Sequence, residues 1–419
     1  MKLKHAYILC LCLFVMLCFF IPGAGHFDTH FWVNWSVALK TTGLAHAYTI
    51  PELNYNPIYL YVLRAYAAAM PNAEAIAHNI HYLKVFTLLF DIGAVMLLMW
   101  WANKHGRTIF IAFFVLFNIA YLYNTLFWGQ IDAIHTTLVF AAFVLAFEEK
   151  LIWSAVIFLI ALNTKTQAIL FLPVLGLVWL PILKGNGKTI AKGLIVLITL
   201  QVLIILPFLL KGTAGNIWNN YVGVVDYNKA LSMHAYNFWY LILWENSEVP
   251  RDLPDTDTLL GVTYKAWGFI MFCLASAIAL IPLLLKSAVA WVKGHRLGFE
   301  QAEQFMLSAA LVAVIFFFFP TQMHERYSHP ALLFAGAYFV ISKRWVIFLF
   351  ISYAYIMNLE SLDKCWKLDN YKTFAFDARL ISVLYAISLV YGTYRLYKDY
   401  GIKADLRELK GRFGKKQLA

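Results

Sequence analysis

Residues 6–24 read AYILCLCLFVMLCFFIPGA, and residues 25–30 continue as GHFDTH. An uninterrupted apolar run of this length is what an α-helix needs to cross a hydrocarbon core of about 30 Å. The run is longer than the apolar region of a signal peptide, and no clear Ala-x-Ala cleavage site follows it, so we expect an uncleaved anchor. Asp28, just past the run, places a carboxylate at a membrane edge, where an acid persists if it pairs, binds or reacts.

Similar runs recur along the chain of 419 residues, of which 62% are hydrophobic and only 14% charged. A soluble domain of this length has a far more polar composition. The five cysteines are odd in number and lie mostly in apolar runs, so they indicate no disulfide framework. The sequence therefore predicts an all-α polytopic membrane protein.

We expect one membrane domain over residues 1–419 with about twelve transmembrane helices. The predicted spans are 6–24, 83–102, 108–126, 132–147, 151–163, 167–183, 190–210, 266–285, 304–319, 329–341, 345–358 and 379–397.

The connections between these spans divide into a basic and an acidic set. Both termini and five short connections fall on one side, which carries 21 of the 34 Lys and Arg residues. The positive-inside rule makes that side cytoplasmic, including a basic tail at 398–419. Three loops are then external: 25–82, 211–265 and 359–378. Anionic lipid headgroups account for the net charge of +11, so no nucleic-acid partner is indicated.

Residues 55–69, in the first external loop, are apolar but too short to span a membrane comfortably. Their tyrosines suit the membrane interface, where aromatic residues gather. We therefore expect a helix lying on the membrane surface here.

Four polar clusters interrupt the apolar runs, and all fall on the external side of the predicted topology. They are Asp28 with His26, His30, Trp32 and Trp35; Trp128-Gly129-Gln130-Ile131-Asp132; Asn163-Thr164-Lys165-Thr166-Gln167; and His324-Glu325-Arg326-Tyr327. The last two would bring Lys165 and Arg326 close to the acids of the first two.

One carboxylate beside fixed cations at a membrane surface suits the transfer of a sugar from a lipid phosphate. The acceptor hydroxyl must lose a proton to a base, for which a carboxylate is suitable. The phosphate leaving group needs electrostatic stabilisation more than protonation. A glycosidase would instead need two cooperating carboxyl groups.

In this order, the motifs resemble those of the polytopic GT-C glycosyltransferases, most closely the bacterial mannosyltransferases related to the second mannosyltransferase of GPI-anchor assembly. The similar segments are Asp28 after the first span, Tyr55-Asn56-Pro57-Ile58-Tyr59, Trp128-Gly129-Gln130-Ile131-Asp132, Lys165-Thr166-Gln167, Ser232-Met233-His234-Ala235-Tyr236-Asn237-Phe238-Trp239 and Met323-His324-Glu325-Arg326-Tyr327. The chain departs from the family at Asn56, where proline is common, and at His234, where asparagine is frequent.

The resemblance implies an inverting transfer of a hexose, with mannose favoured, from a polyprenyl-phosphate donor at a site facing away from the cytoplasm of a bacterial inner membrane. The acceptor would be a hydroxyl of a glycan, glycolipid or protein. Asp28 looks like the catalytic base, and His324-Glu325-Arg326 is similar to the His-Glu-Lys stretch of dolichyl-phosphate-glucose glucosyltransferases. The candidate donor-phosphate or substrate-binding residues are Gln130, Asp132, Lys165, His324, Glu325, Arg326 and Tyr327.

Each candidate also has a purely structural interpretation. Asp28 and Asp132 could cap helices, Lys165 could extend to the interface, and Glu325 and Arg326 could form a structural ion pair. Tryptophans and tyrosines of the outer face could stack on sugars or anchor in the interface; these are Trp32, Trp35, Tyr59 and Trp128.

Two further groups of residues have less specific interpretations. The acids of the second external loop are expected to be solvated; they are Glu245, Glu248, Asp252, Asp255 and Asp257. The expected sugar transfer requires no cofactor. Binding of a divalent metal stays possible only through histidine pairs such as His26 and His30, and no cysteine accompanies them as a further ligand.

Two other functions stay open at this stage. A secondary transporter would place charged residues near the bilayer midplane in two matching halves, whereas only Asp91 is clearly in mid-span. A lipid-linked glycan ligase or polymerase would share the same geometry and differ in its donor.

Overall fold

The computed structural model describes residues 2–23, 28–223, 229–243 and 249–416. This part of the chain is all-α apart from one short antiparallel pair, β1 (Thr258–Leu259) and β2 (Val262–Thr263), in which Thr258 pairs with Thr263. The helices are α1 (Leu3–Phe19), α2 (Thr29–Thr42), η1 (Leu44–Thr49), α3 (Pro57–Ala69), α4 (Ala73–Asn79), η2 (Ile80–Tyr82), α5 (Leu83–Lys104), η3 (Ile109–Ile111), α6 (Ala112–Leu116), α7 (Ile119–Tyr123), η4 (Asn124–Trp128), α8 (Asp132–Phe147), α9 (Leu151–Thr164), η5 (Thr166–Phe171), α10 (Leu172–Leu183), α11 (Gly187–Leu210), α12 (Gly215–Gly223), α13 (Phe238–Ile242), α14 (Val249–Asp252), α15 (Tyr264–Lys293), α16 (Phe299–Phe318), α17 (His329–Ser342), α18 (Val346–Asp363), η6 (Phe374–Phe376), α19 (Ala378–Asp399) and α20 (Ile402–Lys416).

The prediction of an all-helical chain with several membrane-length helices is confirmed. Among the described residues, seven helical stretches are long and apolar enough to cross a membrane, and two shorter pieces bent by 51° form an eighth candidate. The seven are Ala73–Lys104, Thr166–Leu183, Gly187–Leu210, Tyr264–Lys293, Phe299–Phe318, Val346–Asp363 and Ala378–Asp399. The remaining predicted spans coincide with four shorter apolar helices, α1, α8, α9 and α17.

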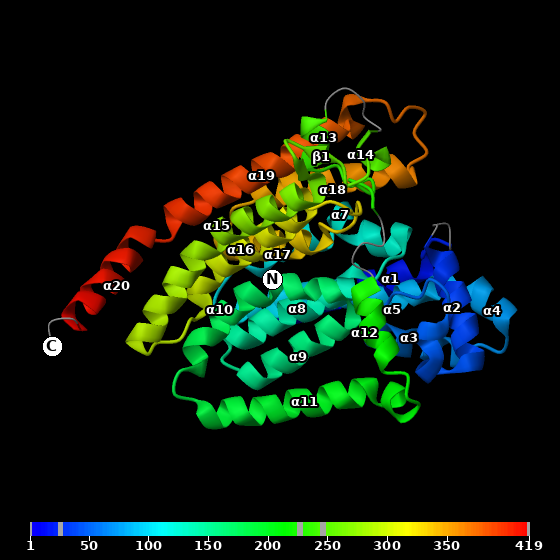
Figure 1. Ribbon diagram of the computed structural model, residues 1–419, viewed down its shortest axis with the longest axis horizontal. Helices are drawn as coiled ribbons and strands as arrows, with labels where there is room; N and C mark the ends of the chain where they lie inside the picture. The colour runs from blue at the N-terminus through cyan, green and yellow to red at the C-terminus, as the bar shows by residue number, and fades with distance from the viewer. Residues whose placement is uncertain (1, 24–27, 224–228, 244–248, 417–419) are drawn as a thin grey trace.

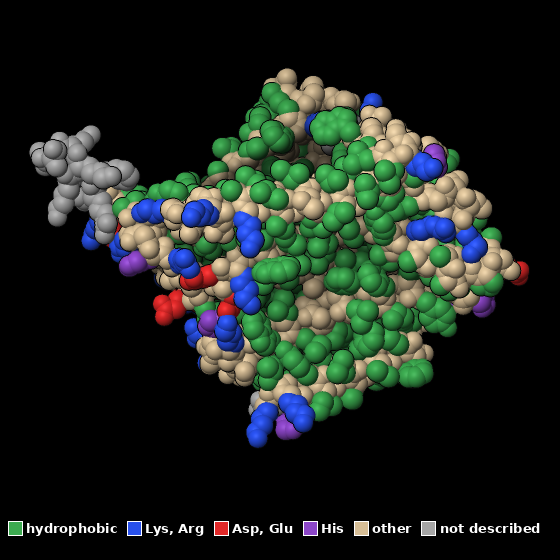
Figure 2. Space-filling view, turned by 90° about the horizontal axis from the view of Figure 1, so that it is seen from below, with side chains coloured by type: hydrophobic (Ala, Val, Ile, Leu, Met, Phe, Trp, Pro, Cys, Tyr) green, Lys and Arg blue, Asp and Glu red, His purple; other side chains and the backbone are tan. Residues whose placement is uncertain are grey.

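The outer helices expose apolar side chains that a soluble protein would bury. Only 11% of the most apolar stretch of α11 and 22% of that of α15 are buried, compared with 83% for α16 at the centre. Figure 2 shows hydrophobic side chains covering the middle of one face, with most of its Lys and Arg toward the ends. A surface region of exposed apolar side chains is stable in an apolar environment, as expected of a protein embedded in a membrane.

The basic connections predicted to share one side contact one another across the structure. Lys104 and His105, after α5, pair with Glu148 after α8, and Arg296 pairs with Glu149. Further along the chain, Arg344 pairs with Asp399 at 2.8 Å, and Lys286 of α15 pairs with Asp405 of α20 at 2.9 Å. Segments distant in sequence therefore meet at one end of the helical array.

The opposite end holds the helices of the first predicted external loop. Figure 1 shows α2, α3 and α4 gathered there, far from α20. Trp32 and Trp35 lie three residues apart on α2, so both point into a small core with Tyr59 and Leu60 of α3. The predicted helix within residues 55–69 is α3, which begins at Pro57, a residue suited to a first helical turn.

One acid of the second external loop is buried, contrary to the expectation that the whole run is solvated. Asp255 is 1% exposed and accepts hydrogen bonds from Thr321 Oγ1 at 2.9 Å and Gln322 Nε2 at 2.7 Å. These two hydrogen bonds connect the second external loop to the segment between α16 and α17. Asp252 and Asp257 are exposed as expected, whereas Glu245 and Glu248 lie outside the described residues.

We predict that Asp255→Ala lowers the free energy of unfolding by roughly 1–3 kcal/mol, because it removes the buried carboxylate that accepts hydrogen bonds from the Thr321 hydroxyl and the Gln322 amide. Thermal unfolding of the purified protein in detergent measures the effect. The matched control is Asp257→Ala, two residues away and exposed, which should unfold with the wild type. Equal behaviour of the two variants would contradict a bracing role for Asp255.

Candidate functional site

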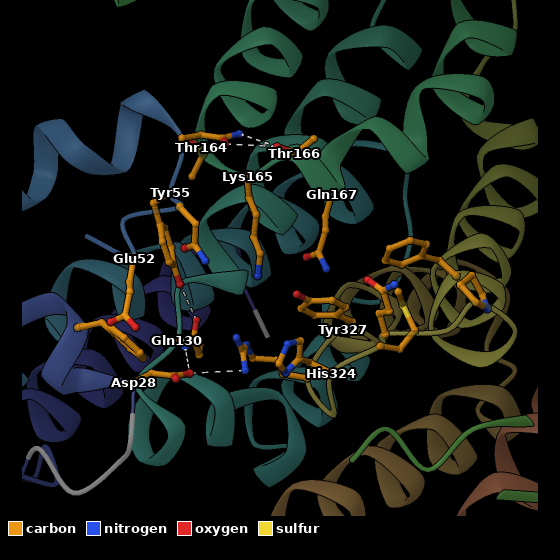
Figure 3. A pocket seen from close by; sticks show the side chains of 18 of the residues that line it. Asp28, Glu52, Tyr55, Gln130, Thr164, Lys165, Thr166, Gln167, His324 and Tyr327 are labelled. Carbon is orange, nitrogen blue, oxygen red and sulfur yellow. Dashed lines mark hydrogen bonds and ion pairs between the residues drawn. The ribbon is translucent and has the colours of Figure 1, made fainter. Parts of the chain in front are cut away.

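A cavity of about 590 Å³ lies where the four polar clusters meet (Figure 3). Its walls come from the first external loop, the segments before α8 and η5, the start of α15 and the segment between α16 and α17. The lining residues are Asp28, Phe31, Trp32, Trp35, Glu52, Asn54, Tyr55, Asn56, Gln130, Thr164, Lys165, Thr166, Gln167, Lys265, Phe269, Phe316, Pro320, Thr321, Gln322, Met323, His324, Arg326 and Tyr327. Asp132 and Glu325 are buried directly behind this wall.

Asp28 turns its carboxylate toward the cavity and does not cap α2. In the described part of the chain, its side chain makes no cap hydrogen bond to that helix. One carboxylate oxygen instead accepts a hydrogen bond from Gln130 Nε2 and lies 3.5 Å from Arg326 Nη1. The side chain is 26% exposed, more than the other two carboxylates of the cluster. Of these three acids, Asp28 is therefore the one that a ligand in the cavity can reach.

A tight turn brings Gln130 to this carboxylate. The π-helical segment η4 ends at Gly129, whose φ of +79° is a conformation that glycine adopts without steric cost. The turn is closed by the Gln130 N–H, which donates to the Asn124 carbonyl at 3.0 Å. A Cβ at Gly129 would lie 3.4 Å from Lys84 Cε, so the backbone there passes close to a lysine.

Lys84 holds the two segments that carry Asp28 and Gln130. Its Nζ donates to the carbonyl oxygens of Leu126 at 2.8 Å, Pro22 at 3.1 Å and Gly23 at 3.3 Å. Lys84 is not among the residues predicted from the sequence, although a lysine at the second position of an apolar helix indicates that a nearby acceptor is needed.

Asp132 is the first residue of α8 and, like Asp28, makes no side-chain cap among the described residues. Its carboxylate pairs with Lys165 Nζ and accepts a hydrogen bond from Asn124 Nδ2 at 3.1 Å. Lys165 lies in the turn between α9 and η5, and its Nζ is 5.4 Å from the centre of the Tyr327 ring. Burial lowers the pKa of Lys165, and Asp132 acts against that shift.

Arg326 is the junction of the ionic cluster. Its Nη1 lies 2.9 Å from Glu325 Oε1 and 3.5 Å from Asp28, and its Nε lies 4.0 Å from Asp132 Oδ2. Nε has no hydrogen-bond partner within the part of the chain that the structure describes. The guanidinium is thus attracted by three acids but hydrogen-bonded directly only to its neighbour Glu325.

Glu325 and His324 lie behind and beside Arg326. Burial acts to raise the pKa of Glu325, but His324, whose Nδ1 lies 3.7 Å from Glu325 Oε2, and the charge of Arg326 lower it to about 2. The ring of Tyr327 packs 5.1 Å from that of His324, and burial raises the pKa of Tyr327 to about 12. Glu325 is therefore a fixed negative charge near neutral pH, and Tyr327 is a neutral hydroxyl.

The cluster contains three carboxylates and only two permanent cations. Asp28, Asp132 and Glu325 share Lys165 and Arg326, so an anionic ligand that pairs with either of these cations competes with a carboxylate for it. The contact between Asp28 and Arg326 is the easiest to displace, because it is longer than the Glu325 contact and its acid is the most exposed. Asp28 and a bound anion would thus compete for Arg326.

The aromatic candidates divide into two pairs. All four side chains are buried, but Trp32 and Trp35 border the cavity, whereas Tyr59 and Trp128 do not line it. Lys165 pairs with the buried Asp132 instead of extending to the membrane interface, whereas the contact between Glu325 and Arg326 agrees with a structural ion pair. Lys165 and Arg326 also line the cavity, where a ligand could contact them.

Several wall residues were not singled out from the sequence. Tyr55 donates a hydrogen bond to Gln130 Oε1 at 2.9 Å. Glu52, with a φ of +60°, and Gln167 also face the cavity (Figure 3). The positive φ of Glu52 cannot be predicted from the sequence. Tyr55, in contrast, is the first residue of the motif Tyr55-Asn56-Pro57-Ile58-Tyr59, and its place there could have marked it as a candidate site residue.

Within the described residues, no group of three or more His, Cys, Asp or Glu side chains is arranged to hold a metal ion. His26, half of the histidine pair considered for a metal, lies outside those residues, and His30 is exposed. No protein-family model matches the chain, and no curated protein matches it.

The lowered pKa of Glu325 predicts a specific dependence of stability on pH. A carboxyl group whose pKa falls from 4.5 to about 2 on folding stabilises the protein above pH 4.5 and loses that contribution as the pH falls toward 2. Glu325→Gln should therefore flatten the loss of thermal stability between about pH 5 and pH 3. Glu52→Gln, at an exposed site, is the control and should show the wild-type dependence of thermal stability on pH. If Glu325→Gln also shows the wild-type dependence, the lowered pKa of Glu325 is contradicted.

Proposed function

We propose that this chain is a GT-C type membrane glycosyltransferase that transfers a hexose, with mannose favoured, from a polyprenyl-phosphate-sugar donor to a hydroxyl acceptor. The observation that carries the proposal is the meeting of Asp28, Lys165 and Arg326 at one cavity. An accessible carboxylate can act as a base, and adjacent cations can stabilise a phosphate leaving group.

The proposed reaction is a single displacement with inversion. The acceptor oxygen forms a bond to the anomeric carbon as the bond from that carbon to the phosphate oxygen breaks. The hydroxyl proton passes to Asp28, and the electron pair of the broken bond leaves with the polyprenyl phosphate. Arg326 and Lys165 stabilise that anion, so no second carboxyl group is needed to protonate it.

Binding of the donor would itself prepare the base. Because the cations are already shared by three acids, the donor phosphate would take the place of Asp28 at Arg326. A sugar phosphodiester carries one negative charge, so the cations of the site have less charge to neutralise than they would with a diphosphate-linked donor. Asp28 would then lose its contact with Arg326 just as the donor arrives, which leaves the carboxylate available to accept the hydroxyl proton.

The surroundings of the cavity fit a substrate with a lipid part. Phe269 of α15, 64% exposed, and Phe316 of α16 line the side of the cavity next to the apolar surface. A polyprenyl chain would follow this side, whereas Trp32 and Trp35 would contact sugar rings on the other.

The proposed topology has twelve spans, both termini in the cytoplasm and the site on the periplasmic face of a bacterial inner membrane. The basic connections cluster at the end opposite α2, α3 and α4, as the positive-inside rule requires of cytoplasmic segments. A secondary transporter would instead have its charged site near the midplane, and the ionic cluster at helix ends favours the transferase.

Donor specificity tests this function. Purified protein is incubated with polyprenyl-phosphate mannose, polyprenyl-phosphate glucose, a diphosphate-linked oligosaccharide and a nucleotide sugar, together with membrane lipids and glycans as acceptors. We expect transfer from a polyprenyl-phosphate hexose. Transfer only from the oligosaccharide would indicate a ligase, and transfer only from the nucleotide sugar, or from none of the donors, would refute the proposal.

Removal of either cation should weaken donor use. Arg326→Gln and Lys165→Met should each reduce kcat/KM for the donor by roughly 10- to 100-fold, because a charge-assisted contact to phosphate is lost. Lys265→Met, at an exposed position of the same cavity, is the control and should lose less. Equal losses in all three variants would argue against a specific phosphate position.

The orientation of the chain in the membrane can be tested separately with variants that carry one introduced cysteine and none of the native ones. In intact cells, a membrane-impermeant maleimide should label Asp257→Cys, whereas Lys188→Cys should react only after permeabilisation. Both positions are exposed, so the reverse pattern would overturn the proposed orientation.

A further inference from the structure

Tyr55 is joined to Asp28 through a single side chain, Gln130. The Tyr55 hydroxyl donates to Gln130 Oε1 at 2.9 Å, and Gln130 Nε2 donates to the Asp28 carboxylate. Gln130 is 1% exposed, so neither end of its amide can readily exchange its partner for water. Figure 3 shows the three side chains in line along one wall of the cavity.

The chemistry of the three groups fixes the direction of this chain. An ionised carboxylate only accepts hydrogen bonds, so the amide N–H must face Asp28. The amide oxygen then faces the other way and needs a donor, which the phenol supplies. If the amide turned over, its oxygen would face the carboxylate, and two acceptors would meet without a proton between them.

Tyr55 itself is held by its surroundings. Its ring packs 5.3 Å from those of Trp35 and Tyr59, and its carbonyl oxygen accepts a hydrogen bond from the Tyr48 hydroxyl at 3.1 Å. Burial raises the pKa of Tyr55, so the phenol keeps its proton near neutral pH and stays a donor.

We propose that Tyr55 is a positioning residue that sets the orientation of the Gln130 amide, so that the amide N–H donates to the Asp28 carboxylate and keeps it aimed into the cavity. This inference rests on the proposed role of Asp28 as the base. Tyr55 acts through Gln130 and does not exchange a proton with substrate.

The charged and titratable groups around Asp28 come from four segments. Arg326 and, behind it, Glu325 approach from the segment before α17. Asp132 lies at the start of α8, Lys165 lies after α9, and Glu52 faces the cavity from the segment before α3. The Tyr55 hydroxyl donates to Gln130 and not to any of these five residues, so a change at Asp28 in the variant without that hydroxyl reports on the amide.

Tyr59 offers a matched control in the same aromatic group. Its hydroxyl is buried and has no hydrogen-bond partner among the residues that the structure describes. Tyr55→Phe and Tyr59→Phe therefore each remove one oxygen from neighbouring rings, but only the first removes a donor to Gln130.

The test is the pH dependence of Asp28 labelling by a hydrophobic carbodiimide, which reacts with protonated carboxyl groups, followed by mass spectrometry of the Asp28 peptide. In Tyr55→Phe, the protonation equilibrium should shift toward the acid form by roughly 3- to 10-fold, which moves the labelling midpoint up by about half to one pH unit. Tyr59→Phe should keep the wild-type midpoint. Equal midpoints in all three proteins would overturn the proposal.

A double variant separates positioning from loose packing. Gln130→Met should raise the midpoint on its own, and adding Tyr55→Phe should then have no further effect, because the link is already broken. Additive shifts would show that Tyr55 acts on Asp28 by another route and would also overturn the proposal. These readouts need no donor and no transfer, so absence of transferase activity would refute the proposed function without deciding this inference.

Discussion

The structure depends on an uneven sharing of charge: three carboxylates lie around two permanent cations at one end of a helical array. Asp132 and Glu325 are buried and hold Lys165 and Arg326 in place. Asp28 is the third acid, with a longer contact and a more exposed side chain. Because charges are costly to bury without partners, the helices that carry them must meet here, and the arrangement leaves Asp28 available for a ligand.

This constraint links the fold to the proposed chemistry. The cations are neutralised when the cavity is empty, so they need no bound anion to be stable. An arriving phosphate would compete at Arg326 with Asp28, which is the most exposed of the three acids and the proposed base. The same contact would therefore restrain Asp28 before donor binding and release it afterwards. Lys84 supports this geometry from outside the cluster, since it ties the segments that precede Asp28 and Gln130 to each other.

Much of the fold and part of the site could be predicted from the sequence. Helix positions follow from apolar runs, and each predicted span overlaps an observed helix because length and hydrophobicity are local properties. The four polar clusters were visible as interruptions of those runs, and the structure brings them together. The contacts of Tyr55, Lys84 and Asp255 were not predictable in this way, because their partners lie 42 to 75 residues away and include backbone carbonyl oxygens that carry no sequence signal.

The most direct test of the central claim is to measure donor binding and sugar transfer in the same preparation of Asp28→Asn. If Asp28 is the base and competes with the donor phosphate for Arg326, this variant should bind polyprenyl-phosphate mannose at least as tightly as the wild type, while transfer falls by roughly 100-fold or more. Transfer at the wild-type rate, or loss of donor binding in a correctly folded variant, would contradict the account.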